Sequence, residues 1–238
     1  MGLRGKGIEI ISSKTQLDAF VSNLDKSYLL QEFISYDNEI GVFLIRNRNK
    51  ALEITSIVSR EFMSIVGDGV STIQDLFLAV PRYAMQIDWI SASSDLDVER
   101  VLVAGEELVF TKIGNHSKGA MFKNGESLNT KQLLSTMQSI FQAYPDFNYG
   151  RIDLKYKNHI DLMAGVNFKI MELNGVFSEP AHIYDPELKL LDGWKVLLQH
   201  FRKLFEVSIR SINDGYEPIP LLLGLKKIKE HFLVVSRM

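Results

Sequence analysis

Two short runs in the second half of the chain carry side chains that could hold a metal ion. Arg151 and Asp153 lie two residues apart, and so do Glu172 and Asn174. Residues i and i+2 of a β-strand project from one face, so two neighbouring strands would place a cation and three oxygen ligands on one surface. Divalent cations such as Mg²⁺ prefer oxygen ligands, usually with phosphate oxygens and water. The spacing therefore predicts a metal–phosphate site on a sheet, and with it a nucleotide.

A simpler interpretation of the same residues is the solvated face of a hairpin, where charged side chains need no ligand. The position of Asn174-Gly175, where a strand would end at the rim of a site, favours the metal site. Arg151 on the same face would make bidentate contacts to a phosphate or to a developing acyl phosphate.

An apolar segment near the N-terminus ends in Gln31-Glu32-Phe33-Ile34 and is followed by Glu39. An apolar strand that runs into polar sequence and then turns can offer backbone N–H and C=O groups to the edge of an adenine. The Glu39 carboxylate could accept hydrogen bonds from ribose hydroxyls. The alternative is a buried strand that enters a turn and binds nothing.

Two polar loops are candidates for phosphate contacts. In the first, Gly5 and Gly7 would let backbone N–H groups approach a phosphate closely, and Lys6 adds charge. It matches neither the Walker A nor the Rossmann spacing, and a tail without fixed structure is the simpler interpretation. The second loop contains Lys112 and Asn115, and it fits an ordinary solvated loop equally well.

The composition indicates a soluble globular protein that is large enough for a substantial core: 238 residues, 46% hydrophobic and 24% charged. A net charge of −2 argues against general attraction to nucleic acids or membrane surfaces, so neither is expected as a partner. The absence of cysteine excludes disulfides, thiolate metal sites and cysteine nucleophiles. It also fits a reducing compartment, and without a signal peptide or an apolar run of membrane-spanning length we expect a cytoplasmic protein.

Strand-like segments alternate with helical ones, which predicts an α+β fold. Strands are expected at residues 8–11, 28–34, 39–45, 51–59, 108–113, 150–156 and 168–173. Helices are expected at residues 15–24, 72–80, 130–144, 188–212 and 221–235. The segment between the last two strands is expected to be a polar loop.

Taken in order, these motifs resemble the ATP-grasp superfamily. The carboxylate–amine ligase branch is the most similar, including D-alanine–D-alanine ligase, cyanophycin synthetase and the glutathione-synthetase-like ligases. The resemblance covers residues 4 to about 185, and its specific parts are the Gly-Asp-Gly-Val-Ser-Thr-Ile run and the Arg-x-Asp…Glu-x-Asn pair. The matching segments are residues 4–8, 30–34 with Glu39, 66–73, 114–120, 150–153 and 171–175.

The resemblance implies a role for each candidate residue. Asp153, Glu172 and Asn174 would hold Mg²⁺ or Mn²⁺, and Arg151 would steady the acyl phosphate and the tetrahedral species. The glycine loop would cover the triphosphate, the segment before Glu39 would contact adenine, and Met171 would line the adenine pocket. The ATP-binding residues implied in this way are Gly5, Lys6, Gly7, Gln31, Glu32, Phe33, Ile34, Glu39, Lys112, Asn115 and Met171.

The implied fold has two β-rich lobes that enclose a nucleotide, without the domain that usually precedes them. Residues 1–33 would be the remnant of the small lobe, residues 34–187 the large lobe with the metal site, and residues 188–238 C-terminal helices packed on the same domain. The implied activity is ATP- and Mg²⁺-dependent ligation of a small-molecule carboxylate to an amine through an acyl phosphate. Alternatives are a truncated, non-catalytic ATP/Mg²⁺-binding module and a small-molecule kinase, and a partner or homo-oligomer could complete the site.

Overall fold

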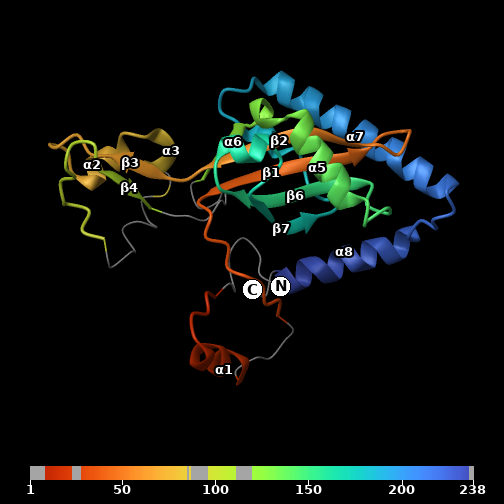
Figure 1. Ribbon diagram of the computed structural model, residues 1–238, viewed down its shortest axis with the longest axis horizontal. Coiled ribbons are helices and arrows are strands. Elements are labelled where there is room, and N and C mark those ends of the chain that lie inside the picture. Colours follow the sequence, from red (N-terminus) through yellow and green to blue (C-terminus); the bar gives the residue numbers. More distant parts are fainter. Residues whose placement is uncertain (1–8, 23–27, 85, 87–95, 111–119, 236–238) are drawn as a thin grey trace.

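A five-stranded antiparallel sheet forms the centre of the computed structural model, which describes residues 9–22, 28–84, 86, 96–110 and 120–235 (Figure 1). Its strands follow the order β5-β2-β1-β6-β7, and each neighbouring pair is antiparallel. The expected α+β class is confirmed. The strands of this sheet are β1 (Asn38–Arg46), β2 (Leu52–Glu61), β5 (Met121–Asn124), β6 (Tyr149–Tyr156) and β7 (Phe168–Asn174).

One face of the sheet packs against α5 (Lys131–Phe141) and α6 (His159–Met163) and forms the main core. Alternate residues of β1, Ile40, Val42 and Leu44, point into this core and are fully buried. The helix α5 begins where the side chain of its N-cap, Thr130, accepts a hydrogen bond from a backbone N–H. The short 3-10 helix η2 (Glu126–Leu128) precedes α5.

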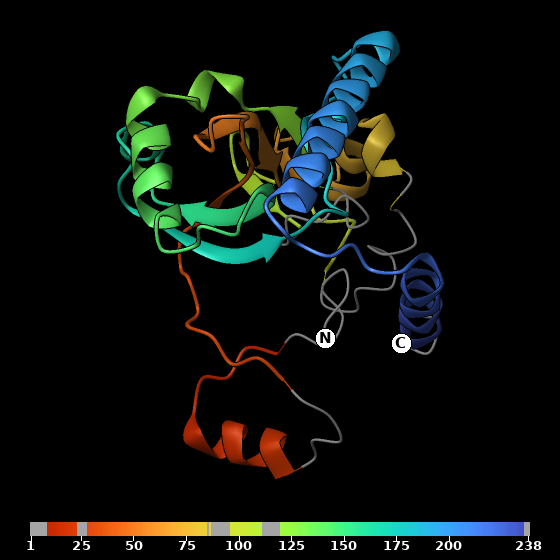
Figure 2. The ribbon, with the colours of Figure 1, turned by 90° about the vertical axis from the view of Figure 1, so that its right-hand side faces the viewer.

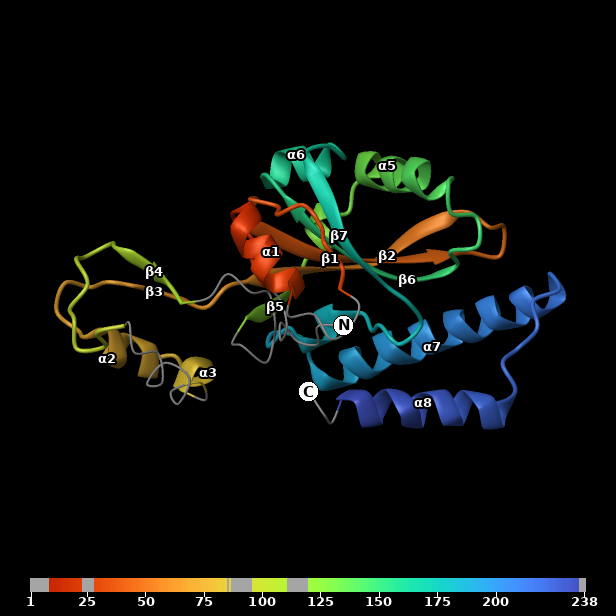
Figure 3. The same ribbon diagram turned by 90° about the horizontal axis from the view of Figure 1, so that it is seen from below.

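The opposite face of the sheet is divided between an apolar and a polar half. The long helix α7 (Leu190–Asn213) covers the apolar half, where Phe43, Tyr149 and Val207 are buried together. Figure 2 and Figure 3 show the sheet lying between α5 on one side and α7 on the other. Because α7 covers only one half, the other half is open to polar side chains. The chain reaches α7 through the 3-10 helix η3 (Ala181–Tyr184), which packs on β2 and β5.

A small unit between β2 and β5 has its own core and extends to the left in Figure 1. It contains β3 (Ser64–Val66), β4 (Glu107–Val109), α2 (Ile73–Leu78) and α3 (Pro81–Ala84). Thr72 caps α2 in a reciprocal capping box with Asp75, at the start of the helix that the sequence predicts at residues 72–80. Its core is Met63, Ile65, Ile73, Phe77, Tyr83 and Leu102.

Two helices project from this framework. In α1 (Lys14–Ser22) no residue is buried, and α8 (Leu221–Val235) contains no buried residue among those whose exposure is described. Figure 1 and Figure 2 show both helices standing clear of the sheet. Among the described helices, none combines the length and apolar character that a membrane span requires.

The predicted strands at 39–45, 51–59, 150–156 and 168–173 are confirmed within three residues, and the helices at 188–212 and 221–235 within two. Two predicted strands are wrong, since the described residues of 8–11 and all of 28–34 form no strand. An apolar run becomes a strand only when a neighbour pairs its backbone groups, and neither run is paired here. The predicted loop between β6 and β7 contains α6, whose N-cap Asn158 accepts a hydrogen bond from a backbone N–H.

Candidate active site

The predicted metal residues lie on the polar half of the sheet face, and the strand register brings them together. In the β6–β7 pair, Asp153 lies opposite Glu172 and Arg151 lies opposite Asn174. Directly opposed residues of an antiparallel pair project from the same face, with Cβ atoms about 4.5–5.5 Å apart. The four residues that the sequence singled out therefore occupy adjacent positions on one surface.

Asp153 is the centre of this cluster, and only 5% of its surface is exposed. Arg151 donates from Nε to Oδ1 at 2.8 Å and from Nη2 to Oδ2 at 3.1 Å. The amide of Asn174 donates to Oδ2 at 3.1 Å, and Arg60 Nη2 lies 3.0 Å from the same oxygen. A carboxylate buried to this degree requires such compensation, because desolvation strongly disfavours an isolated charge.

Arg60 on β2 joins Asp153 to Glu39 on β1, whose carboxylate it also contacts as an ion pair. Burial raises the pKa of Glu39, the guanidinium of Arg60 opposes this shift, and the Asp153 carboxylate adds to it. The guanidinium also lies 5.7 Å from the ring centre of Phe122. Sequence reasoning missed Arg60. The signal available was its position two residues after Val58 on β2, because residues two apart on a strand lie on the same face and Val58 is buried.

Glu172 differs from Asp153 in being exposed, and it makes no ion pair within the described part of the chain. Like charges directly opposite on two strands destabilise the pair. A divalent cation between the two carboxylates, completed by the amide oxygen of Asn174, would remove that repulsion with ligands of the preferred kind. The donor set therefore fits Mg²⁺ or Mn²⁺ chemically.

The structure also shows what such an ion would displace. Both oxygens of Asp153 are engaged by Arg60, Arg151 and Asn174. Among the described residues, no group of three or more His, Cys, Asp or Glu side chains is arranged to hold a metal ion. An ion at this position would therefore have to compete with a guanidinium for Asp153.

Gly41 makes room for the cluster. It lies opposite Asp153 in the β1–β6 register. A Cβ atom at this position would lie 3.0 Å from Cδ of Arg151, 3.0 Å from Val58 and 3.1 Å from Oδ1 of Asp153. A larger residue would therefore press against the Asp153 carboxylate and the aliphatic part of the Arg151 side chain.

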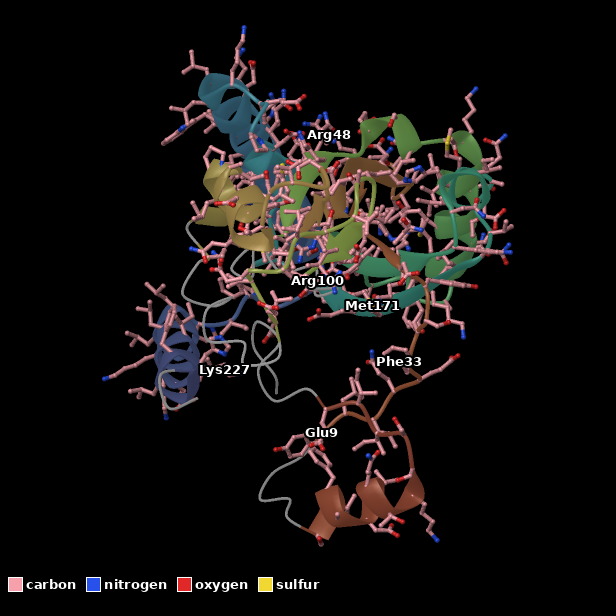
Figure 4. All side chains as sticks on the ribbon, turned by 90° about the vertical axis from the view of Figure 1, so that its left-hand side faces the viewer. Glu9, Phe33, Arg48, Arg100, Met171 and Lys227 are labelled. Atoms are coloured by element: carbon pink, nitrogen blue, oxygen red, sulfur yellow. The ribbon has the colours of Figure 1, made fainter. Side chains whose placement is uncertain are left out.

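The segment expected to contact adenine runs beside the β6–β7 edge without forming a strand. Glu32 forms an ion pair with Lys169 on β7, and Lys155 on β6 donates to the carbonyl of Ile34 at 3.5 Å. Met171 is half-buried at the irregularity in the β6–β7 pairing. Figure 4 shows Phe33 on the segment that leads into the sheet and Met171 on the sheet near its end.

Gln31 and Phe33 are exposed in this segment, and Phe33 retains 65% of its accessible surface. The other predicted ATP contacts, Gly5, Lys6, Gly7, Lys112 and Asn115, lie outside the described residues. Their roles stay predictions.

No protein-family model and no curated protein sequence matches the chain. Among solved structures, the chain is similar to a bifunctional glutathione synthetase from Pasteurella multocida, with 12% sequence identity and a TM-score of 0.46. The similar region covers 72% of this chain and 25% of the synthetase chain, so this chain spans about a quarter of that enzyme. A likeness at this level adds no argument about the site.

Proposed function

We propose that the polar half of the sheet face binds ATP with Mg²⁺, and that the chain is an ATP-grasp ligase joining a small-molecule carboxylate to an amine. One observation carries the proposal: the β6–β7 register places Arg151, Asp153, Glu172 and Asn174 together on one surface. The sequence resemblance links this constellation, in this order along the chain, to ATP-dependent ligases.

Each residue of the constellation has a part in this proposal. Asp153, Glu172 and Asn174 would hold the ion, which when bound supplies positive charge that offsets the charge of the phosphates. Arg151 is the nearest cation to these ligands and would contact a transferred phosphoryl group by two parallel hydrogen bonds. Arg60 contacts Asp153 and Glu39 from the strand β2 and would orient both carboxylates, which makes it a positioning residue.

In the reaction, a carboxylate oxygen of the first substrate attacks the γ-phosphorus of ATP, and ADP leaves. The amine of the second substrate then attacks the carbonyl carbon of the acyl phosphate. Inorganic phosphate leaves with the bonding electrons, the amine nitrogen loses a proton, and an amide remains. Such chemistry needs positioning and charge stabilisation rather than a nucleophile on the protein. The guanidinium of Arg151 would stabilise the negative charge that develops in both steps.

ATP binding tests the metal assignment. We expect calorimetric titration with ATP to show tighter binding with Mg²⁺ than without it, and Glu172→Gln to remove most of that difference. Glu172 is exposed, so the substitution should leave the fold intact. The matched control is Glu107→Gln, an exposed residue of β4 on the small unit. Equal Mg²⁺ dependence in wild type and Glu172→Gln would contradict the assignment.

Turnover separates the ligase from a binding module. We expect phosphate release from ATP to rise when a panel of amino acids and short peptides is added. One observation favours the second candidate, a non-catalytic nucleotide-binding module: both oxygens of Asp153 are already engaged by protein groups. ATP binding without phosphate release on any substrate would support the module, and ADP formation with polyols but not with carboxylates would indicate a kinase.

A further inference from the structure

The helix α7 has a second apolar face that nothing in the described structure covers. It consists of eight large side chains, each between 45% and 76% exposed, which we call the α7 stripe. Monomeric soluble proteins rarely expose contiguous apolar patches larger than a few hundred Å². The members of the α7 stripe are Leu190, Leu191, Trp194, Leu198, Phe201, Phe205, Ile209 and Ile212.

The stripe is distinct from the face that packs on the sheet. His200, Leu204 and Val207, at the spacing of one helical face, contact the sheet side. With 100° per residue, the stripe lies roughly a third of a turn around the helix from them. A helix that packs on one domain needs only one apolar face, so the second face requires a separate explanation.

The α7 stripe follows the whole length of the helix. Leu191, Leu198, Phe205 and Ile212 follow one another at intervals of seven residues. This interval, close to two helical turns, aligns side chains in a seam that a second helix can cover along its whole length. The expected occupant is therefore another helix rather than a compact ligand.

The exposed helix α8 of the same chain is too short to cover the stripe. It has 15 residues against 24 in α7, or about 22 Å against about 36 Å. It also carries an exposed apolar seam of its own, with Leu221, Leu225, Ile228 and Phe232. Docking α8 on α7 within one chain would still leave the end at Leu190 uncovered.

Six of the eight stripe positions are symmetric about a point between Phe201 and Arg202. In an antiparallel pair centred there, Leu191 would face Ile212 and Trp194 would face Ile209 of the second helix. Leu198 would face Phe205, so six of the eight side chains meet an apolar partner, while Leu190 and Phe201 would face Asn213 and Arg202 of the second helix. In a parallel pair, each residue would face its own copy, including the largest, Trp194. Antiparallel helix dipoles also attract each other.

We propose that a second copy of this chain covers the α7 stripe, with the two α7 helices antiparallel about a twofold axis near Phe201. A twofold interface uses the same patch on both subunits, as a self-complementary stripe requires. The exposed surface of the stripe is on the order of 1,000 Å² per copy, and a standard-size interface buries about 800 Å² per partner. The two α8 helices can then pack against the flanks of the pair. The proposal is independent of ATP binding.

Sedimentation velocity of the full chain tests the dimer. We expect a species of twice the 27.1 kDa chain mass, and the double variant Leu198→Glu, Phe205→Glu should raise the dimer dissociation constant by roughly a hundredfold or more because it buries charges. Gln199→Glu, an exposed polar position on α7, should leave the dimer intact. Circular dichroism checks that all variants remain folded. A wild-type monomer at all concentrations, or an unaffected double variant, overturns the proposal.

Crosslinking tests whether the two α7 helices are antiparallel. The chain has no natural cysteine, so a single introduced cysteine is the only thiol that can react. Phe201→Cys lies near the proposed axis and should join two chains through a short thiol-reactive crosslinker. Leu190→Cys should not, because its two copies would lie roughly 30 Å apart. Equal crosslinking of both variants would indicate parallel helices and overturn the arrangement. A wild-type monomer that floats with vesicles of phosphatidylserine and phosphatidylcholine would instead assign the stripe to a lipid surface, which also overturns it.

Discussion

Replacing Arg60 with methionine tests the charge network of the proposed site. Arg60 lies between two buried carboxylates, Glu39 and Asp153, which are 7% and 5% exposed. Methionine has a similar length but no charge. The variant therefore leaves both carboxylates in place and removes the cation between them.

The expected loss of stability follows from what each carboxylate retains. Asp153 keeps its contacts with Arg151 and Asn174, whereas Glu39 loses the one ion pair that it makes within the described structure. Breaking a buried pair by removing one partner costs about 3–5 kcal/mol. For a chain of this size that corresponds to a fall of roughly 10 °C in the melting temperature. The matched control, Arg48→Met, breaks an exposed pair with Glu206 and should cost about 0–1 kcal/mol.

Urea unfolding at two pH values provides the measurement. The pKa of Glu39 is already raised by burial, and losing Arg60 should raise it further. The native state then binds more protons than the unfolded state, so the stability of Arg60→Met should recover partly as the pH falls from about 7 to about 5. Adding Glu39→Gln to Arg60→Met should restore part of the loss, because it removes the unpaired charge. A cost no larger than that of Arg48→Met, or no recovery with Glu39→Gln, would refute the reasoning.

Three further substitutions test the packing around the site by urea unfolding. Gly41→Ala should cost about 1–3 kcal/mol because its Cβ would press on Cδ of Arg151, on Val58 and on the carboxylate of Asp153; a cost equal to that of Gly175→Ala, where the space is open, would contradict this. Burial lowers the pKa of His200 to about 4, so its contribution to stability is present above about pH 6.5 and is lost on acidification. His200→Gln should therefore lose about 2 kcal/mol less stability than wild type between about pH 7 and about pH 5, and an equal loss in the two proteins would contradict this. Leu133→Ala should cost about 2–5 kcal/mol with an unchanged denaturant slope, and a loss below about 1 kcal/mol would argue against its burial in the main core.

The residues of the cluster on β6 and β7 could be predicted because their relation is local. Two pairs with i, i+2 spacing lie on strands joined by a short connection, and a one-residue slip would turn the charged set of one strand away from that of the other. The observed register places Asp153 opposite Glu172. The pattern alone was therefore sufficient to bring these side chains to one surface, although it left open whether they face a ligand or water.

Arg60 could not be predicted in the same way because its partners are distant in sequence. It precedes Asp153 by more than ninety residues, and the two meet only because β1 lies between β2 and β6 in the sheet. Strand order is not encoded in any local pattern. The three-residue strands β3 and β4 were missed or misplaced for a related reason, since so short a pair leaves no period to detect.

The two faces of α7 show a further limit of periodicity. The sequence predicted the helix at 188–212, close to its observed extent, because apolar residues recur at helical spacing. That spacing does not say how many neighbours the helix has. The sheet side contacts His200, Leu204 and Val207, and the remaining large apolar residues of α7 lie on a separate, exposed face. The number of apolar residues in α7 therefore exceeds what one sheet can bury, and the excess argues for a contact outside the described chain.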